Sequence, residues 1–420
     1  MEKKNNNNNL KYSFLINNDF ILVNILKYFD IKELYSISHT NKTFNNIINS
    51  LTLPINFYNN LIISSSNLIP ISVQNKILKK IENYKINSLN IILNEDENFS
   101  LKLLQNLNNL QKLSIPLSIL YENIFNNYQN LSELIIKNMY FNEGKMDKNI
   151  ILVKNLLNLK HLKKLKLNNV KYITGEFLNY LKCNLEYLDL KESMEFKLQD
   201  IRAYLIKDSN YLQTLKIDGE YTEPSAILNI LPHLVKLTTL TITYCENFPD
   251  EVINLLSVLF GQFKKLTLRK LRNISSYAFE NFFKNPSVNL IKLDLYDAQH
   301  LNNYSIKDLY KNYNLEYLDL SWSDNIKNEN IVKIFINCRK LKKIFLQGCK
   351  CLDDQIFEDS LLQKDYKIKK CLGKFLYKID LTKCDLISDK IIKEVNEEYK
   401  NICILNYYGK DLRYDDFYYN

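Results

Sequence analysis

The sequence has 420 residues, of which 46% are hydrophobic and 12% aromatic, so it can bury a sizeable core and is not a disordered chain. Its 56 basic and 47 acidic residues leave a net charge of +9, and the lysines occur as scattered pairs, a distribution that does not favour nucleic-acid binding. No two of the seven glycines lie closer than 25 positions, and the four histidines are more than 60 positions apart, which excludes glycine-rich phosphate loops and H-E-x-x-H metal helices.

The amino-terminal end begins with an asparagine-rich stretch, residues 1–12, which we expect to be a disordered tail. The apolar stretch that follows is interrupted by polar residues, so we expect no signal peptide. Nowhere do 18 apolar residues run together, as a membrane-spanning helix would require. We therefore expect a soluble protein, cytoplasmic and/or nuclear, with reduced cysteines and no membrane partner.

Residues 13–52 carry three short stretches with the apolar spacing of helices, and the second opens on a capping box at Asp30–Glu33. The predicted inward faces hold Leu22, Ile25, Leu26 and Phe29 in the first stretch, Leu34 and Ile37 in the second, and Phe44, Ile47, Ile48 and Leu51 in the third. Three short helices make a marginal domain, so this module should need a partner or the rest of the chain for stability.

The segment from Ile16-Asn17-Asn18-Asp19 to Thr40-Asn41-Lys42-Thr43-Phe44 resembles an F-box, whose pattern begins L-P-x-E, continues through I-L-x-x-L and ends V-C-K-x-W or F. Asn17 stands where the family has proline, and Thr40-Asn41 replaces Val-Cys. The resemblance implies that the module docks on a Skp-family adaptor, which connects it to a cullin ubiquitin ligase. The positions that would contact the adaptor are Ile16, Leu22, Ile25, Leu26, Phe29, Leu34 and Phe44. The same apolar residues could instead form only the core of the small module.

After a connecting segment at 53–85, a repeat of the form L-x-x-L-x-L occupies residues 86–408. Thirteen copies, with first anchors from Ile86 to Ile402, recur with a mean step of about 26 residues, within the 20 to 29 range of leucine-rich repeats. The alternating part of each copy predicts a short strand, and the part that follows predicts a helix, as at 331–338. We expect an α/β leucine-rich-repeat solenoid, a horseshoe with parallel strands on its concave face and helices on its convex face.

Cysteines occupy a fixed position of the repeat, three residues after the last strand anchor. Cys245, Cys349 and Cys384 fill this position, and Val170, Leu271 and Ala298 fill it in other copies. An apolar residue and a polar pair follow, so residues 160–400 resemble the cysteine-containing class of leucine-rich repeat. Because small apolar residues replace these cysteines, we interpret them as buried core, and we expect neither a metal nor another cofactor.

A candidate substrate-binding surface lies on the concave face, where polar strand positions point away from the core. Large aromatic residues and charges gather on neighbouring repeats there, a composition typical of binding hot spots. The predicted surface comprises Arg269, Lys292, Asp294, Tyr296, Tyr317, Asp319, Trp322 and Phe345. Alternatively, Trp322 folds over a loop. Arg269 and Lys292 could also contact a phosphate on the partner.

The tyrosine-rich end, residues 409–420, is interpreted as a cap or tail. Together with the resemblance, these features predict a non-catalytic substrate-recognition subunit of an SCF-type cullin ubiquitin ligase, whose repeats bind a protein substrate that the sequence does not identify. The alternative is a leucine-rich-repeat scaffold unconnected to ubiquitination, with a degenerate F-box. Since no array of ligating cysteines and histidines occurs, we expect the chain itself not to be an enzyme.

Overall fold

The computed structural model describes residues 60–63, 78, 86–91, 97–120, 124–137, 148–170, 174–193, 196–207, 211–362 and 375–413. The predicted tail at 1–12, the helical module at 13–52 and its adaptor-contacting residues lie outside these ranges. The chain divides into two compact units, residues 1–185 with 193–195, and residues 186–192 with 196–420.

The described part of the first unit contains five parallel strands, paired in chain order. They are β1 (Asn60–Ile63), β2 (Ser88–Ile91), β3 (Lys112–Pro116), β4 (Glu133–Lys137) and β5 (Lys164–Asn168). Helices α6 (Glu97–Asn106) and α7 (Lys148–Leu156) and the 3-10 helix η2 (Leu117–Ile119) lie between these strands, and the 3-10 helix η3 (Gly175–Tyr180) follows β5. Strand β1 falls within the segment expected to be only a connection, and it adds a strand ahead of the predicted repeats.

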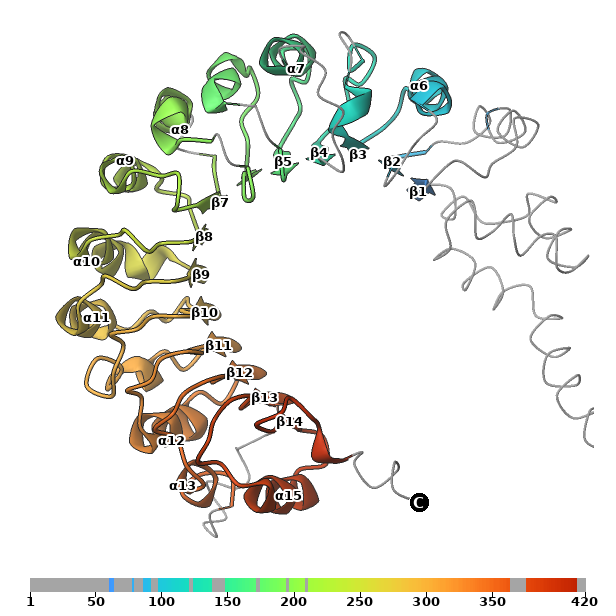
Figure 1. The fold of residues 1–420 in the computed structure, drawn as a ribbon. Coiled ribbons are helices and arrows are strands. Elements are labelled where there is room, and N and C mark those ends of the chain that lie inside the picture. The colour runs from blue at the N-terminus through green and yellow to red at the C-terminus, as the bar shows by residue number, and fades with distance from the viewer. Residues whose placement is uncertain are drawn as a thin grey trace, which may run out of the picture. The chain divides into compact units, whose positions relative to one another are not determined.

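The second unit repeats the same arrangement, with its strands on one side and its helices on the other (Figure 1). Its parallel strands pair in chain order: β6 (Tyr187–Asp189), β7 (Thr214–Asp218), β8 (Thr239–Thr243), β9 (Lys265–Leu268), β10 (Lys292–Asp294), β11 (Tyr317–Asp319), β12 (Lys343–Phe345), β13 (Lys378–Asp380) and β14 (Cys403–Leu405).

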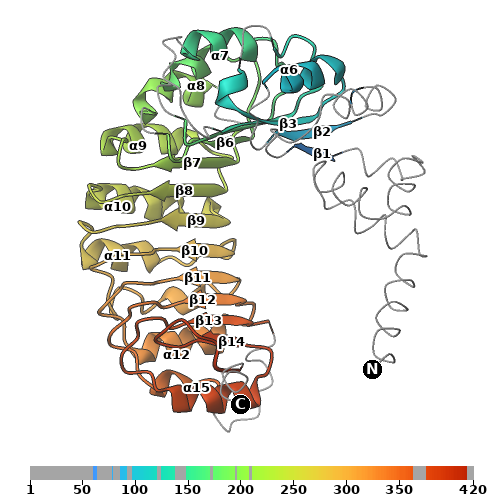
Figure 2. The same ribbon diagram turned by 45° about the vertical axis from the view of Figure 1, so that its right-hand side comes forward.

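The helices of the second unit cover one face of these strands, as Figure 2 shows for β7–β11. They are α8 (Arg202–Lys207), α9 (Pro224–Ile230), α10 (Asp250–Leu259), α11 (Ser276–Phe283), α12 (Asn328–Asn337), α13 (Gln355–Glu358) and α15 (Asp389–Glu398), with 3-10 turns η4 (Leu198–Ile201), η5 (Leu231–His233), η6 (Phe260–Gln262) and η7 (Leu309–Lys311). No helix in the described ranges is long and apolar enough to span a membrane.

The predicted repeats and the observed strands coincide, because each of the thirteen copies carries one of β2–β14. The central apolar residue of each strand, such as Leu266, Leu293 or Leu318, is completely buried between the sheet and the helices. Burial of one such side chain contributes roughly 2 kcal/mol. Helix α12 buries Ile331, Ile334 and Phe335, as its spacing predicts. The fold is therefore a leucine-rich-repeat solenoid.

The cysteine position lies inside the core. Cys245, Cys349 and Cys384 are fully buried, and their thiols donate to the carbonyl oxygens of Ile242 (3.3 Å), Leu320 (3.4 Å) and Leu346 (3.0 Å). Val170, Leu271 and Ala298 are equally buried there, so the position accepts apolar side chains of different sizes and does not require a thiol.

The residue just before the cysteine position has a left-handed backbone in repeat after repeat. Positive φ angles occur at Asn169, Glu192, Tyr244, Lys270, Asp297, Trp322, Gly348 and Lys383. Each of these residues stands four positions after the central apolar residue of its strand. In most of them the N–H then bonds to the next repeat, as from Trp322 to the carbonyl of Gln347 (2.6 Å) and from Gly348 to that of Thr382 (2.8 Å). The turn therefore extends the ladder of hydrogen bonds beyond the strands.

The polar pair that follows the cysteine position connects one repeat to the next. Asp250 accepts from the backbone N–H (2.7 Å) and the hydroxyl (2.6 Å) of Ser275, which itself caps α11. Asp354 accepts in the same way from Ser388, at 2.7 and 2.6 Å, and Ser388 caps α15. The serine hydroxyl thus accepts a hydrogen bond from a free backbone N–H at the start of its own helix, while an aspartate of the preceding repeat holds the serine in place.

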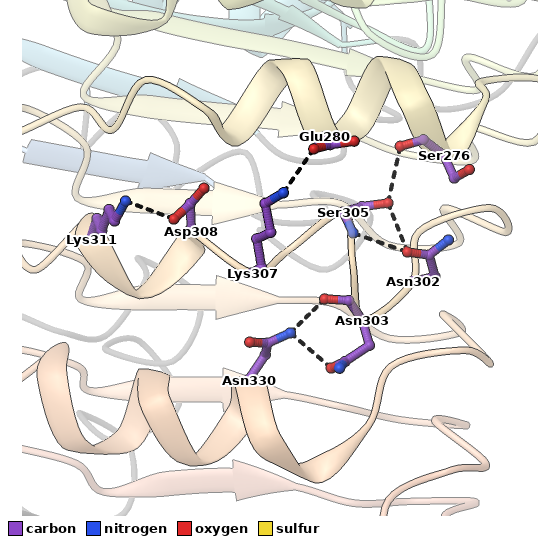
Figure 3. A network of polar contacts seen from close by, with 9 residues as sticks. All are labelled: Ser276, Glu280, Asn302, Asn303, Ser305, Lys307, Asp308, Lys311 and Asn330. Atoms are coloured by element: carbon purple, nitrogen blue, oxygen red, sulfur yellow. Dashed lines mark hydrogen bonds and ion pairs between the residues drawn. The ribbon is translucent and has the colours of Figure 1, made fainter.

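Further polar contacts join three successive repeats beside α11 and α12 (Figure 3). Lys307 Nζ lies 2.8 Å from Glu280 Oε1, and the Ser305 hydroxyl donates to the first carbonyl of α11 at 3.1 Å. Asn330 Nδ2 donates to Asn303 Oδ1 at 2.8 Å. These contacts hold the stretch between β10 and β11, which has little helix of its own, against the helices on both sides.

Candidate functional site

Two rows of side chains cross β10–β13 on the sheet face opposite the helices, which we call the strand face. Because the strands are parallel and in register, equivalent residues lie side by side. The first row is Lys292, Tyr317, Lys343 and Lys378, and the second is Asp294, Asp319, Phe345 and Asp380.

Four of these side chains form a continuous series of contacts, which we call the cation–aromatic ladder: Lys292, Tyr317, Phe345 and Lys378. Lys292 Nζ lies 4.4 Å from the centroid of the Tyr317 ring, and the Tyr317 and Phe345 centroids are 5.1 Å apart. Lys378 Nζ lies 5.3 Å from the Phe345 centroid. Each such cation–ring contact contributes about 0.5–1 kcal/mol at an exposed position, so the ladder is held in place before any partner binds.

The aspartates of the second row are not part of the exposed surface. Asp294, Asp319 and Asp380 are 0%, 4% and 3% exposed, so the prediction that Asp294 and Asp319 present charge to a partner is wrong. Their short side chains lie beneath the longer residues beside them and accept hydrogen bonds at the ends of the strands. Asp380, for example, accepts from the Thr382 hydroxyl at 2.7 Å and from the Gln347 amide at 2.8 Å.

Arg269 and Asp294 form a two-pronged ion pair at one edge of the ladder. Arg269 Nε lies 3.0 Å from Asp294 Oδ1, and Nη2 lies 2.8 Å from Oδ2. The hydrogen bond to Asp294 raises the pKa of Arg269 above its usual value. Lys292 Nζ lies 3.5 Å from the same carboxylate, and the Tyr296 ring lies under the guanidinium, 5.5 Å away. Arg269, Lys292, Asp294 and Tyr296 therefore lie together, with Arg269 committed to Asp294.

The carboxylates alter the titration of their neighbours. Burial, and then the nearby Asp294, raise the pKa of Asp319, against the opposing effect of the Ser321 N–H that donates to it at 3.0 Å. Burial, and then Asp294 and Asp319, raise the pKa of the Tyr317 phenol. Tyr317 therefore stays protonated at physiological pH and contributes a neutral ring to the strand face.

Trp322 does not belong to the ladder. It follows β11 with φ at 62°, is 38% exposed, and its ring lies over Gly348 in the next turn. Within the described ranges, no ring contact joins it to Tyr317 or Phe345. The alternative interpretation, that Trp322 folds over a loop, is the one that the structure supports.

Lys343 and Lys378 belong to the same surface, although the sequence analysis did not select them. Lys343 Nζ lies 5.3 Å from the centroid of the exposed Tyr377 ring. Both lysines directly precede the central apolar residue of their strands, and Tyr317 holds the same position in β11. Aligning the repeats on this position would have placed the two lysines beside Tyr317 from the sequence alone.

Four of the described cysteines have thiols that burial keeps protonated. Burial raises the pKa of the Cys338 and Cys384 thiols to about 12 and raises those of Cys245 and Cys349 further, so these thiols remain protonated and unreactive. Across the described ranges, no three or more His, Cys, Asp or Glu side chains are grouped so as to hold a metal ion.

Comparison with known proteins identifies the amino-terminal module. Residues 18–56 match the F-box domain. This range includes Leu22, Ile25, Leu26, Phe29, Leu34 and Phe44, whereas Ile16 lies just before it. The adaptor contacts predicted for these residues stay predictions, because the structure does not describe them.

Two relatives extend the comparison to the repeats. The DNA repair protein rhp7 of Schizosaccharomyces pombe is 22% identical over 254 residues, which are 58% of this chain but only 44% of rhp7. The crystal structure of the Rad7 and Elc1 complex in yeast has a chain with a TM-score of 0.58 at 17% identity, over 82% of this chain and 89% of that chain. This likeness establishes a shared fold. The chain thus joins a segment that matches the F-box domain, residues 18–56, to a leucine-rich-repeat solenoid.

Proposed function

We propose that the chain is a non-catalytic substrate-recognition subunit of an SCF-type cullin ubiquitin ligase. The F-box would dock on a Skp-family adaptor, and the repeats would hold the protein to be modified. The single observation that carries this proposal is the F-box match at residues 18–56 on the same chain as the leucine-rich repeats.

The side chains on the repeats are suited to binding a partner protein, as a substrate-recognition subunit requires. The strand face of β10–β13 presents aromatic rings and cations at fixed positions, which suits recognition of a partner protein. The described cysteine thiols at the repeat position are buried, so these thiols are not available to carry ubiquitin. Transfer would then belong to the other subunits.

Two kinds of adaptor are candidates for this complex. Rad7, which shares the fold, was solved in a complex with Elc1, so an Elc1-type protein is tested beside a Skp-family adaptor. Because rhp7 carries the name of a DNA repair protein, the nucleus is the compartment to examine first, with the cytoplasm second.

Co-expression with each adaptor tests the proposal. We expect the wild-type chain to elute with one of them from a sizing column, and a Leu26→Asp, Phe29→Asp variant to elute without it. Two buried charges within the F-box would each cost several kcal/mol when desolvated at the interface. Tyr277→Ser, which changes an exposed ring on α11, is the matched control and should bind like the wild type.

The outcome separates the two functions considered for this chain. If the wild type elutes alone and folded with both adaptors, the chain is a repeat scaffold without a ligase role. Binding that survives in the Leu26→Asp, Phe29→Asp variant would mean that the adaptor contacts another part of the chain.

A further inference from the structure

We propose that the strand face of β10–β13 binds an acidic, extended segment of the partner protein, with an apolar side chain of that segment on the rings of Tyr317 and Phe345. This inference rests on the proposed role of the repeats in recognition, and it specifies the chemistry that they recognise.

The charged residues exposed on this face indicate the sign of the partner's charge. Its carboxylates, Asp294, Asp319 and Asp380, are buried and hydrogen-bonded, so they do not meet a partner. Lys343 and Lys378 are half-buried on the surface, and within the described ranges neither has a carboxylate at ion-pair distance. The face therefore presents two unpaired cations at its surface and keeps its acids buried beneath them, which complements an anionic partner.

The rings give the second half of the specificity. Tyr317 and Phe345 are half-exposed, and their rings lie side by side at an interplanar angle of 35° between Lys292 and Lys378, so they form an apolar surface flanked by cations. Aromatic side chains at the centre of a charged surface are common anchors for an apolar residue of the partner. A segment with acidic residues on both sides of an apolar residue matches this order.

The width of the ladder limits the length of the segment. Neighbouring strands lie about 4.8 Å apart, so four strands span about 14 Å, the length of roughly four residues of extended chain. The ladder is thus suited to a short linear stretch. Carboxylate and phosphate groups share the required charge, and the experiment below distinguishes them.

The test uses a random peptide-display library selected on the full wild-type chain, followed by fluorescence anisotropy of the selected peptides. We expect enrichment of Asp and Glu around an aromatic or aliphatic residue, and affinity that falls as the salt concentration rises. Replacing Glu by Gln in a selected peptide should abolish binding. Replacing Glu by phosphoserine shows whether the face prefers phosphate or carboxylate.

Variants locate the binding on the ladder. Lys343→Gln with Lys378→Gln should weaken binding about fivefold, since each exposed ion pair contributes a modest factor. Phe345→Ser should also weaken it. Lys236→Gln with Lys284→Gln removes two exposed lysines that follow helices rather than strands, and this control should bind like the wild type. Circular dichroism confirms that each variant is folded.

Several results would overturn the inference: selection of no peptides, selection of neutral or basic ones, equal binding by the Lys343→Gln, Lys378→Gln variant, or tighter binding of a DNA oligonucleotide than of any peptide. Adaptor co-purification is scored separately on the same variants. If acidic peptides bind but no adaptor co-purifies, the inference is upheld and the ligase role is refuted. If an adaptor co-purifies but acidic peptides do not bind, the ligase role is upheld and the inference is refuted.

Discussion

Gly348→Ala tests the packing of Trp322 and the geometry of the turn after β12. A Cβ atom at this position would lie 2.6–2.9 Å from three carbons of the Trp322 ring, well inside van der Waals contact. The backbone also has φ at +66° there, which costs a non-glycine residue about 1 kcal/mol. Tyr244 and Lys270 adopt the same conformation in other repeats, so this backbone cost is tolerated by the fold.

The steric clash supplies the larger cost. Since the Trp322 ring is 38% exposed, it can swing outward rather than distort the core, and loss of its packing adds about 1–2 kcal/mol. We therefore expect Gly348→Ala to lower the free energy of unfolding by about 2–3 kcal/mol. Trp322 is the only tryptophan of the chain, so its fluorescence should shift to the red in the folded variant.

Gly409→Ala provides the matched control. Gly409 has φ at +76°, but its added Cβ would meet only Thr382 at 3.5 Å, an ordinary contact, so only the backbone cost of about 1 kcal/mol applies. Urea unfolding measures both variants, and Trp322→Ala in each background isolates the clash. If Gly348→Ala and Gly409→Ala are equally stable and the tryptophan emission does not move, Trp322 does not lie over Gly348 and the reasoning fails.

Three further predictions concern the core and the strand ends. Asp354→Ala should lower the free energy of unfolding by about 1–2 kcal/mol in urea, because Ser388 loses the acceptor that holds it as the cap of α15; an unchanged midpoint would contradict this. Burial raises the pKa of Asp319 in the folded state above its unfolded pKa of 3.8, so the protonated carboxyl stabilises the fold and this contribution is lost as the pH rises through the raised pKa. In unfolding measured at several pH values, the wild type should show this loss and Asp319→Asn should not; identical profiles would refute the prediction. In the folded chain, iodoacetamide should label exposed Cys351 well before buried Cys245, as peptide mass spectrometry can follow, and equal rates would count against the buried position.

The sequence predicted the strands well because every repeat must bury the same apolar residues against its neighbours. In β2–β13 the central anchor of each copy lies where the periodicity places it. In β14 the predicted central anchor, Leu405, is wrong by one residue, because Ile404 is the buried residue that pairs with Ile379. The cysteine position was predictable for the same reason, since Val170 and Ala298 replace cysteine there. Strand β1 was missed although Leu61 and Ile63 precede Leu89 and Ile91 by 28 residues, because Tyr58 stands at the position of the first anchor.

The strand face was harder to predict, because alternation gives the side of the sheet but not the depth of a side chain. Asp294 and Phe345 occupy equivalent positions, yet the short carboxylate is buried under its neighbours while the ring remains half-exposed. Trp322 was assigned to the face by its nearness to β11, but the left-handed turn directs it over Gly348. Lys343 and Lys378 were overlooked because lysine is abundant in this chain and only the register of the strands distinguishes them.

The left-handed turn also divides each repeat into two segments: the strand and turn, which keep a fixed length, and the segment after the turn, whose length varies. The central residues Leu293 and Leu318 are 25 positions apart, whereas Ile344 and Ile379 are 35 apart, and both pairs lie directly opposite each other. In each of these repeats the left-handed residue still comes four positions after the centre of the strand, at Asp297 and at Gly348. The ten additional residues are therefore absorbed beyond the turn. Insertions and deletions there can accumulate through evolution while the side chains offered to a partner stay aligned.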